Sequence, residues 1–516
     1  MSLIGELQHR LRPPQTFGET RPDSGKSDSV LLLAATSAFL ASGALAAMAI
    51  FVEVLDGHVG DWQFGPIAFL NLGVGALLFR RIAVPRRPPG AAILTAIVFG
   101  LLCFALISTI TYLLTGATTR VDDAFYESIS GYSTTGLSVF DPAEQTHGVL
   151  FWRAGTQWLG GLLGLVIGVI LLPFWVAGRE FADPGGRSVG FKALAPTPLL
   201  GLRHIAELYG ALSAASIVLF AGAGMGWFDA LTYGMTTIST GGFANHDASL
   251  AAFNSGAVEW VAALIMLVAG SSIVIVWWCI RGAVGKLWQA TEMRIYLLVA
   301  AISTVGFAFA ETRANDEPVG ASTALRHGAV TATSALSTTG HRVAEWGEWA
   351  AGPTAALFFL VLTGSMAGSI GGGYRWLRLI EAVKFARREV TIQLHPNAVV
   401  AVKIGGEPAS DSSLGQMNAQ QILVIVTTLV GAFGLAALGL SVLGSLSLAI
   451  SALSTFGPGL GDVATSEGSM IVSGQAMSAP ARMVHAVLMF AGRISIYPVF
   501  TALGSLILGI RRLWRR

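Results

Sequence analysis

A four-residue pattern, Ser-Thr-x-Gly, occurs four times along the chain at nearly even spacing. Successive glycines of the pattern lie 106, 98 and 117 residues apart. Glycine permits backbone angles that are closed to other residues, so a loop at each copy can direct successive carbonyl oxygens to the same side. Such oxygens replace the hydration shell of a small cation, and the pattern therefore predicts a cation site built from four loops. The copies are Ser133-Thr134-Thr135-Gly136, Ser239-Thr240-Gly241-Gly242, Ser337-Thr338-Thr339-Gly340 and Ser454-Thr455-Phe456-Gly457.

Close packing of membrane helices is the alternative explanation of these small residues. Packing requires small residues at i and i+4 on a helix that continues through the pattern. A loop that leaves the helix instead explains why polar residues follow each copy. These are Asp141 in the first, His246 with Asp247 in the second, Arg342 with Glu345 in the third and Asp462 in the fourth.

The elements that must position these loops are apolar segments close to membrane-spanning length. Of the 516 residues, 53% are hydrophobic and 12% are charged, whereas soluble domains carry about 25% charged residues. A bilayer core about 30 Å thick requires roughly 20 apolar residues per helix. This excludes a soluble enzyme with one anchor and predicts an all-α integral membrane protein of about ten transmembrane helices. The segments are 30–52, 64–79, 93–115, 149–172, 205–225, 257–280, 294–310, 354–370, 421–443 and 481–510.

A semi-polar stretch too short to cross a bilayer precedes each copy and lies between two apolar segments. The four stretches are 121–132, 227–238, 324–336 and 444–453. Irregular backbone at membrane depth is tolerated only where protein buries it or where it lines a watery path. We therefore expect four re-entrant half-helices and their loops around one axis. The C-terminal ends of these helices then place partial negative charge at mid-membrane, which stabilises a cation there.

The repeats divide the chain into five parts. We predict four helix, half-helix, helix units related by pseudo-fourfold symmetry around one pore, after a tail with an N-terminal helix pair. The tail and helix pair occupy 1–92, and the pore units occupy 93–180, 181–293, 294–420 (with a long loop on the inner side) and 421–516.

The distribution of charge predicts the orientation. The chain carries 32 Lys and Arg against 30 Asp and Glu, a balance that points to no nucleic-acid partner. With both termini cytoplasmic, 25 of the 32 basic residues lie on the inner side, as the positive-inside rule requires. Six lie outside or at the outer rim, namely Arg120, Arg153, Arg313, Arg326, Arg342 and Arg482. Acidic residues predominate outside and would concentrate cations there, among them Asp122, Asp123, Asp141, Glu144, Glu345, Glu348, Asp462 and Glu467.

These motifs resemble the Trk/Ktr/HKT superfamily of potassium transporters, and most closely its TrkH branch, over residues 93–510. The spans at 30–79 are similar to the N-terminal helix pair of that branch, and the sequence Gly-Pro-Gly-Leu-Gly at 457–461 resembles its fourth filter. The resemblance implies potassium selectivity, because all four filter positions are glycine, whereas sodium-preferring relatives tend to have serine in the first repeat. It assigns the potassium ion to Thr134, Thr135, Gly136, Thr240, Gly241, Gly242, Thr338, Thr339, Gly340, Thr455, Phe456 and Gly457.

A glycine-rich stretch ends the eighth span and is a candidate gate. Five glycines in the ten residues 364–373 make a poor helix, at roughly 1 kcal/mol per glycine relative to alanine. The stretch resembles the intramembrane loop that obstructs the pore in this superfamily, and a close-packed small-residue interface is the alternative. The predicted gate residues of this stretch are Gly364, Gly368, Ser369, Gly371, Gly372 and Gly373.

Arg493 is the one basic residue in the interior of the last span. A charge at that depth costs at least about 2.5 kcal/mol and normally faces a polar cavity or a partner. We interpret Arg493 as a pore-facing barrier to cations that forms part of the gate, as the resemblance also suggests; snorkelling to an interface is the alternative. His341 follows the third filter glycine and is interpreted as a hydrated rim residue, with pH sensitivity as the other possibility.

The sequence thus predicts potassium uptake across a bacterial inner membrane by a protein that is not an enzyme. The resemblance also implies a homodimer assembled on a cytosolic TrkA-type subunit, which would hold the regulatory nucleotide, so that this chain needs no cofactor. Contact with membrane lipid follows from the spans. The alternatives are a sodium or mixed-cation symporter of the same superfamily and, in another class, a polytopic membrane enzyme. Channel and ion-coupled symport mechanisms both remain open.

Overall fold

The computed structural model describes residues 25–504, except 56, 58–61, 83–89, 170–197, 315–318, 345, 347–348, 399, 405–406, 409–410, 460–473, 475–476 and 497. The regular secondary structure of the described chain is helical apart from one short antiparallel ladder, in which β1 (Lys403–Ile404) pairs with β2 (Glu407–Pro408). The all-α fold class is therefore confirmed. The polar N-terminal tail and the terminal arginines lie outside the described residues.

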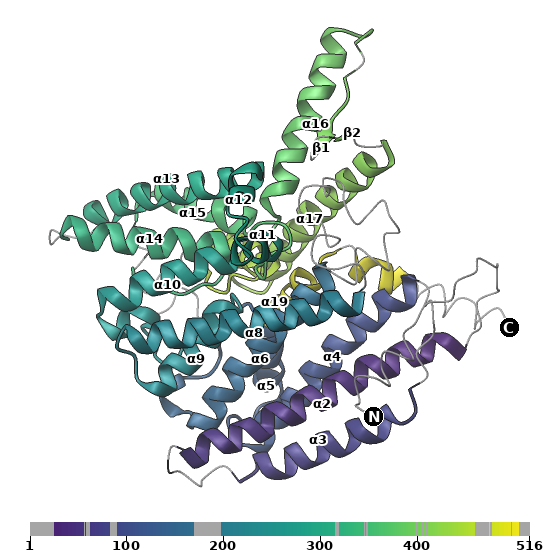
Figure 1. Ribbon diagram of the computed structural model, residues 1–516, viewed down its shortest axis with the longest axis vertical. Helices are drawn as coiled ribbons and strands as arrows, with labels where there is room; N and C mark the ends of the chain where they lie inside the picture. Colours follow the sequence, from purple (N-terminus) through teal and green to yellow (C-terminus); the bar gives the residue numbers. More distant parts are fainter. Residues whose placement is uncertain are drawn as a thin grey trace.

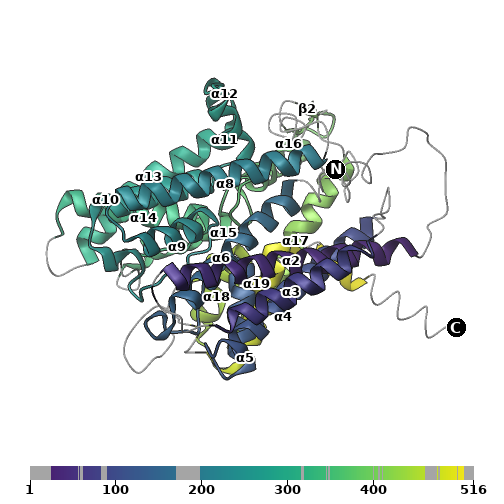
Figure 2. The same cartoon turned by 60° about the horizontal axis from the view of Figure 1, so that its bottom comes forward.

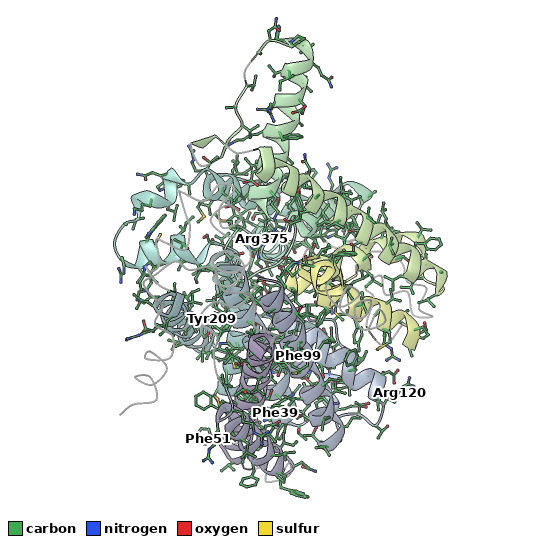
Figure 3. The ribbon with its side chains drawn as sticks, turned by 90° about the vertical axis from the view of Figure 1, so that its right-hand side faces the viewer. Phe39, Phe51, Phe99, Arg120, Tyr209 and Arg375 are labelled. Carbon is green, nitrogen blue, oxygen red and sulfur yellow. The ribbon has the colours of Figure 1, made fainter. Side chains whose placement is uncertain are left out.

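An N-terminal pair of helices, α2 (Gly25–Leu55) and α3 (Phe64–Phe79), lies side by side along one edge of the molecule (Figures 1 and 2). Both helices are apolar, and large side chains face outward from them, such as Phe51, which is 63% exposed and labelled in Figure 3. Such a surface suits contact with lipid. The pair also braces the rest of the protein, because the buried Glu53 carboxylate accepts the backbone N–H of Gly148.

The remaining chain repeats one order of elements four times: a first helix, a half-helix and a second helix. The first helices are α4 (Gly90–Leu114), α8 (Pro198–Gly222), α13 (Thr291–Ala314) and α17 (Asp411–Ala437). The half-helices are α5 (Val121–Tyr132), α9 (Trp227–Ile238), α14 (Ala321–Ser337) and α18 (Val442–Ser454). The second helices are α6 (His147–Leu165), α10 (Gly256–Ala269) with α11 (Ile273–Ile280), α15 (Ala351–Thr363) and α19 (Ala479–Ile494).

Each of the ten predicted spans contains one of these helices or a member of the N-terminal pair. Within the described ranges, five helices are long and apolar enough to cross a membrane, and two bent pairs raise the number to as many as seven. Others are shorter, since α3 has 16 residues and α15 has 13. The short 3-10 helices η1 (Pro142–Glu144) and η4 (Ser249–Phe253) follow the first and second half-helices.

The predicted span 257–280 is not one continuous helix. It bends by 107° between α10 and α11. A loop of the third repeat satisfies the backbone groups freed by this break: Gly270 accepts the N–H of Met366 at 3.0 Å, and Ile273 donates to the Gly368 carbonyl at 2.9 Å. Broken helices are tolerated at membrane depth under this condition. The span 481–510 was likewise predicted to be continuous, but its helix ends at Ile494, and Ser495 has a φ of 74°.

Besides the N-terminal pair, two helices of the described chain stand outside the repeats. The short α12 (Gly285–Gln289) joins α11 to α13, and α16 (Trp376–Leu394) projects from the helical body with the small ladder beside it (Figure 1). Arg375, the residue before α16, lies where this helix leaves the body (Figure 3). The second helices of the repeats are therefore not equivalent: the third continues through a loop into a projecting arm.

Candidate cation-conducting site

The four Ser-Thr-x-Gly segments share one backbone conformation. In every copy the threonine is left-handed, with φ of 56°, 56°, 60° and 56°, and the final glycine has φ of 84°, 78°, 84° and 96°. In every copy the N–H of the third residue donates to a half-helix carbonyl five residues earlier, at 2.8–3.0 Å. This bond is that of a helix-ending Schellman turn, with threonine in the position that usually requires glycine. A β-branched residue with this φ is rare, and its occurrence at four equivalent positions marks a functional constraint.

The four segments close into a ring. A Cβ built on Gly136 would overlap the carbonyl oxygen of Gly241, and one on Gly242 would overlap that of Thr339. The contact continues from Gly340 to the Phe456 oxygen and from Gly457 back to the Thr135 oxygen. A side chain at any of these four positions would therefore collide with a carbonyl oxygen of the next repeat, and the contacts run in the cyclic order one, two, three, four. The structure thus brings all twelve predicted filter residues together, and the serine, threonine and phenylalanine residues of the four motifs are 0–2% exposed.

Two hydroxyl groups of the ring are buried without a partner among the described residues. They belong to Thr134 and Thr455, the left-handed threonines of the first and fourth repeats. A buried polar oxygen without a hydrogen bond is costly, but a cation passing through the ring would supply the missing partner. The equivalent hydroxyl of Thr338 instead accepts the N–H of Gly372 at 2.8 Å.

Gln157 of α6 holds the second filter segment through two hydrogen bonds. This residue is not among those predicted from the sequence. Its Nε2 donates to the Gly241 carbonyl at 2.7 Å, and its Oε1 accepts the N–H of Phe243 at 3.0 Å. The amide thus fixes the backbone on both sides of Gly242. No motif indicates this role, because Gln157 lies 84 residues from the nearer of its partners and only the packing of repeat one on repeat two brings it there.

The interpretation of His341 as a hydrated rim residue is wrong. The side chain is 0% exposed; its Nε2 lies 3.0 Å from the Thr237 hydroxyl, and its ring stacks on Tyr233 with centroids 5.6 Å apart. His341 therefore fastens the third filter segment to the second half-helix. Arg153, which the sequence places outside or at the outer rim, is likewise buried, because its side chain is 2% exposed.

The acidic face predicted outside is partly neutralised. Arg482 of α19 contacts both Asp122 and Asp123 in the first turn of α5, and Arg120 lies 2.7 Å from Asp122. The Arg120 guanidinium holds the pKa of Asp122 below its ordinary range through this hydrogen bond. Asp141 caps η1 by accepting the N–H of Ala143 at 2.9 Å. Positions 345, 348, 462 and 467 fall outside the described residues.

The glycine-rich stretch 364–373 is a loop, as its composition predicted, and it lies against the ring. Cβ atoms at two of its glycines would overlap filter backbone: Gly371 lies against the Ser337 carbonyl, and Gly372 against the Ser454 carbonyl. Gly364, Gly368 and Gly373 have φ of 65°, 72° and 85°, which explains the glycine content. Ser369 donates within the loop, to the Met366 carbonyl at 2.7 Å.

The loop is anchored by Glu292, another residue that sequence reasoning missed. Its Oε1 accepts the N–H of Ala367 at 2.8 Å and the N–H of Leu377 at 3.1 Å. One carboxylate on α13 therefore holds the middle of the loop and also caps the first turn of α16, where an anion is favoured. The signal in the sequence is faint, because Glu292 stands at the start of an apolar segment, as many solvated acids do.

Arg493 bridges the loop and the first repeat. Its Nη1 donates to the Ile370 carbonyl at 3.2 Å, and its Nη2 donates to the Gly160 carbonyl at 2.6 Å. The side chain is part-buried and lies in the last turn of α19, a position where the helix dipole favours a cation. The sequence placed Arg493 in the middle of a continuous span; the structure places it at the end of a helix. The predicted gate residues are therefore brought together at one place beside the ring.

Comparison with known proteins agrees with this geometry. A model of the TrkH family, described as cation transport protein, matches residues 202–506. The Trk system potassium uptake protein TrkH of Halomonas elongata is 28% identical over 85% of this chain and 91% of its own length, and TrkG of Escherichia coli is 28% identical over 73% and 77%. The crystal structure of the potassium transporter TrkH from Vibrio parahaemolyticus superposes with a TM-score of 0.81 at 23% identity, covering 92% of this chain and 97% of that one.

The family match covers more than half of the sequence, and the fold match covers nearly all of it. The chain is a multi-pass membrane protein, and the alternative of a polytopic membrane enzyme is set aside because the relatives are transport proteins. This chain belongs to the TrkH family of cation transport proteins.

Proposed function

We propose that the protein takes up potassium through a single-chain pore whose selectivity filter is the ring of four Ser-Thr-x-Gly segments. The observation that carries the proposal is the closed cycle of glycine and carbonyl contacts from Gly136 to Gly457. Four backbone segments of similar conformation can offer equivalent oxygens, as dehydration of one monovalent cation requires. The relatives from Halomonas and Vibrio are named as potassium transporters, which supports potassium as the ion.

The loop 364–373 and Arg493 act as the gate in this proposal. The loop contacts the ring through Thr338 and the first repeat through Arg493. A permeating cation must pass a fixed positive charge and a folded glycine segment, and both oppose conduction until the loop moves. Because the loop pairs with the α10–α11 break, its movement requires several backbone hydrogen bonds to exchange together, which makes a two-state gate.

The orientation and the partners belong to the same proposal. Both termini and α16 lie in the cytoplasm, since the positive-inside rule favours that topology, and the membrane potential of a bacterial inner membrane drives uptake by about 2.3 kcal/mol per charge per 100 mV. The protein forms a homodimer with one pore per protomer and binds a TrkA-type subunit that carries the regulatory nucleotide. The projection of α16 from the helical body supports this helix as the contact for such a subunit.

Rubidium flux into proteoliposomes tests this function. With an inward-negative potential the purified protein should accumulate rubidium and potassium in preference to sodium. Equal sodium and rubidium flux would favour the mixed-cation alternative, and the absence of any cation flux under all potentials, with and without the regulatory subunit, would overturn the proposal. The mass of the purified protein in detergent solution, measured by light scattering, tests the dimer separately.

A further inference from the structure

A buried ion pair stands directly behind the first filter segment. Arg153 of α6 places its Nε 2.8 Å from Oε1 of Glu127 on α5, and the two side chains are 2% and 0% exposed. A buried charge pair contributes little to stability by itself, because desolvation offsets the attraction, and it persists where every remaining donor and acceptor is satisfied. The partners of Glu127 and Arg153 therefore indicate what the pair holds in place.

Those partners are the residues that follow the first filter glycine. Glu127 accepts the N–H of Val139 at 3.0 Å and the hydroxyl of Ser138 at 2.9 Å. Arg153 donates from Nη2 to the same hydroxyl at 2.9 Å. Ser138 is two residues after Gly136, so both charges fasten the backbone that leaves the ring.

Arg153 also reaches the second repeat. Its Nη1 donates to the Ala244 carbonyl at 3.4 Å, and its guanidinium carbon lies 4.4 Å from the centre of the Phe243 ring. A guanidinium over an aromatic face in a dry site is attracted to it. Gln157, one turn along α6, holds the same segment at Gly241 and Phe243. One face of α6 therefore locks the filter segments of repeats one and two to each other.

The other repeats lack this charged brace at the equivalent position. Nine residues before the filter glycine, repeat one has Glu127, and the other repeats have Tyr233, Thr331 and Leu448. Tyr233 donates to the Ser249 carbonyl at 3.3 Å, Thr331 accepts from Trp346 at 3.4 Å, and Leu448 packs in the core. Repeats three and four instead meet the gating loop at Gly371 and Gly372. One half of the ring is thus fixed by charge, and the other half contacts the gate.

We propose that the Glu127–Arg153 pair is a specificity-determining brace: it fixes the carbonyl positions of repeats one and two and thereby sets the preference of the filter for potassium over sodium. The inference rests on the proposed function and deepens it. Carbonyls held at a fixed radius match one ion size, whereas a loosened segment can close around the smaller sodium ion. Glu127 and Arg153 do not touch the ion; they are positioning residues.

The sodium-to-rubidium flux ratio of Glu127→Gln, measured in proteoliposomes, tests the proposal. The neutral amide leaves Arg153 buried without its counter-charge, and we expect the ratio to rise about tenfold. Glu259→Gln is the matched control, since Glu259 pairs with Arg326 at 2.6 Å between α10 and α14 at the start of the third half-helix. This control should lose thermal stability without a change in the ratio, which separates selectivity from general damage.

Each outcome has one meaning. A potassium-selective wild type with an unchanged ratio in Glu127→Gln overturns the brace and leaves the proposed function standing, whereas a wild type without cation flux overturns the proposed function itself. An equal rise in Glu259→Gln also overturns the brace. If Glu127→Gln cannot be recovered folded, Ser138→Ala is the deciding variant, because it removes only the hydroxyl that joins the ion pair to the filter segment. An unchanged sodium-to-rubidium flux ratio in Ser138→Ala contradicts the proposal. A rise in this ratio that is smaller than tenfold supports it.

Discussion

The Nη1 group of Arg493 donates to the backbone carbonyl of Ile370 at 3.2 Å, so the fourth repeat is tied directly to the intramembrane loop of the third. The same guanidinium reaches Gly160 of the first repeat at 2.6 Å. A single side chain therefore joins three of the four repeats. In the proposed gate, its removal would free the loop and delete a positive charge beside the ion path.

Replacing Arg493 with alanine should raise rubidium flux by about tenfold or more. A unit charge several ångströms from the ion path opposes a cation by a few kcal/mol at an intermediate dielectric, and each 1.4 kcal/mol corresponds to tenfold. The rubidium flux of Arg493→Lys should lie between those of wild type and Arg493→Ala. Lysine keeps the positive charge but cannot donate to the Ile370 and Gly160 carbonyls at once as the guanidinium does. Unchanged flux in Arg493→Ala would remove this residue from the gate.

Replacing Glu292 with alanine should increase the basal rubidium flux, measured without the proposed regulatory subunit. The change removes the oxygen that accepts the N–H groups of Ala367 and Leu377, so the loop loses its anchor to α13. Glu292→Gln keeps an acceptor oxygen and should have the smaller effect. Glu389→Ala, an acid 46% exposed on α16, is the control. Basal flux that stays at the wild-type level in Glu292→Ala would mean that other contacts suffice to hold the loop.

Replacing Gly372 with alanine should disrupt the contact between loop and filter. The added Cβ would overlap the Ser454 carbonyl and the Thr455 hydroxyl, and overpacking against backbone costs about 1–3 kcal/mol. A lower thermal unfolding midpoint and altered flux are expected. Gly352→Ala is the matched control, because a Cβ there meets nothing within 4 Å. Equal midpoints for the two variants would contradict the close approach of the loop to the filter.

Acid should weaken the contact between the first half-helix and the last helix. The Arg120 hydrogen bond lowers the pKa of Asp122 in the folded protein, so this carboxylate contributes stability above its ordinary pKa of about 3.8 and loses that contribution as the pH falls through the lowered value. The unfolding midpoints of wild type and Asp122→Asn should therefore differ at pH 7 and begin to converge only as the pH falls below about 3.8. A constant difference across this range would show that Asp122 does not carry the pH dependence.

Regular local patterns made part of this structure predictable. The half-helices 121–132 and 227–238 have the predicted bounds, because a short semi-polar stretch between two apolar segments allows few other folds. The loop at 364–373 was also predictable, since five glycines cannot maintain a helix. Hydropathy could not reveal the 107° break at Gly270, because its backbone partners come from a different repeat.

The groups that hold the filter were not predictable for a related reason. Gln157 and Arg153 stand on α6, and each reaches a segment 84–91 residues away. His341 looked like a rim residue because polar residues surround it in sequence, whereas in space it meets Thr237 and Tyr233. The left-handed threonines result from the Schellman turn that ends each half-helix, and composition does not predict such a turn at threonine.

The most direct test of the account is the selectivity of Gly242→Ser in proteoliposomes, measured as rubidium against sodium flux beside wild type and Gly352→Ala. A side chain at Gly242 would overlap the Thr339 carbonyl and open the ring between repeats two and three. If the four-glycine ring is the filter, the wild type and the Gly352→Ala control prefer rubidium over sodium, and folded Gly242→Ser has lost this preference. Undiminished rubidium preference in folded Gly242→Ser would contradict the four-glycine ring as the selectivity filter.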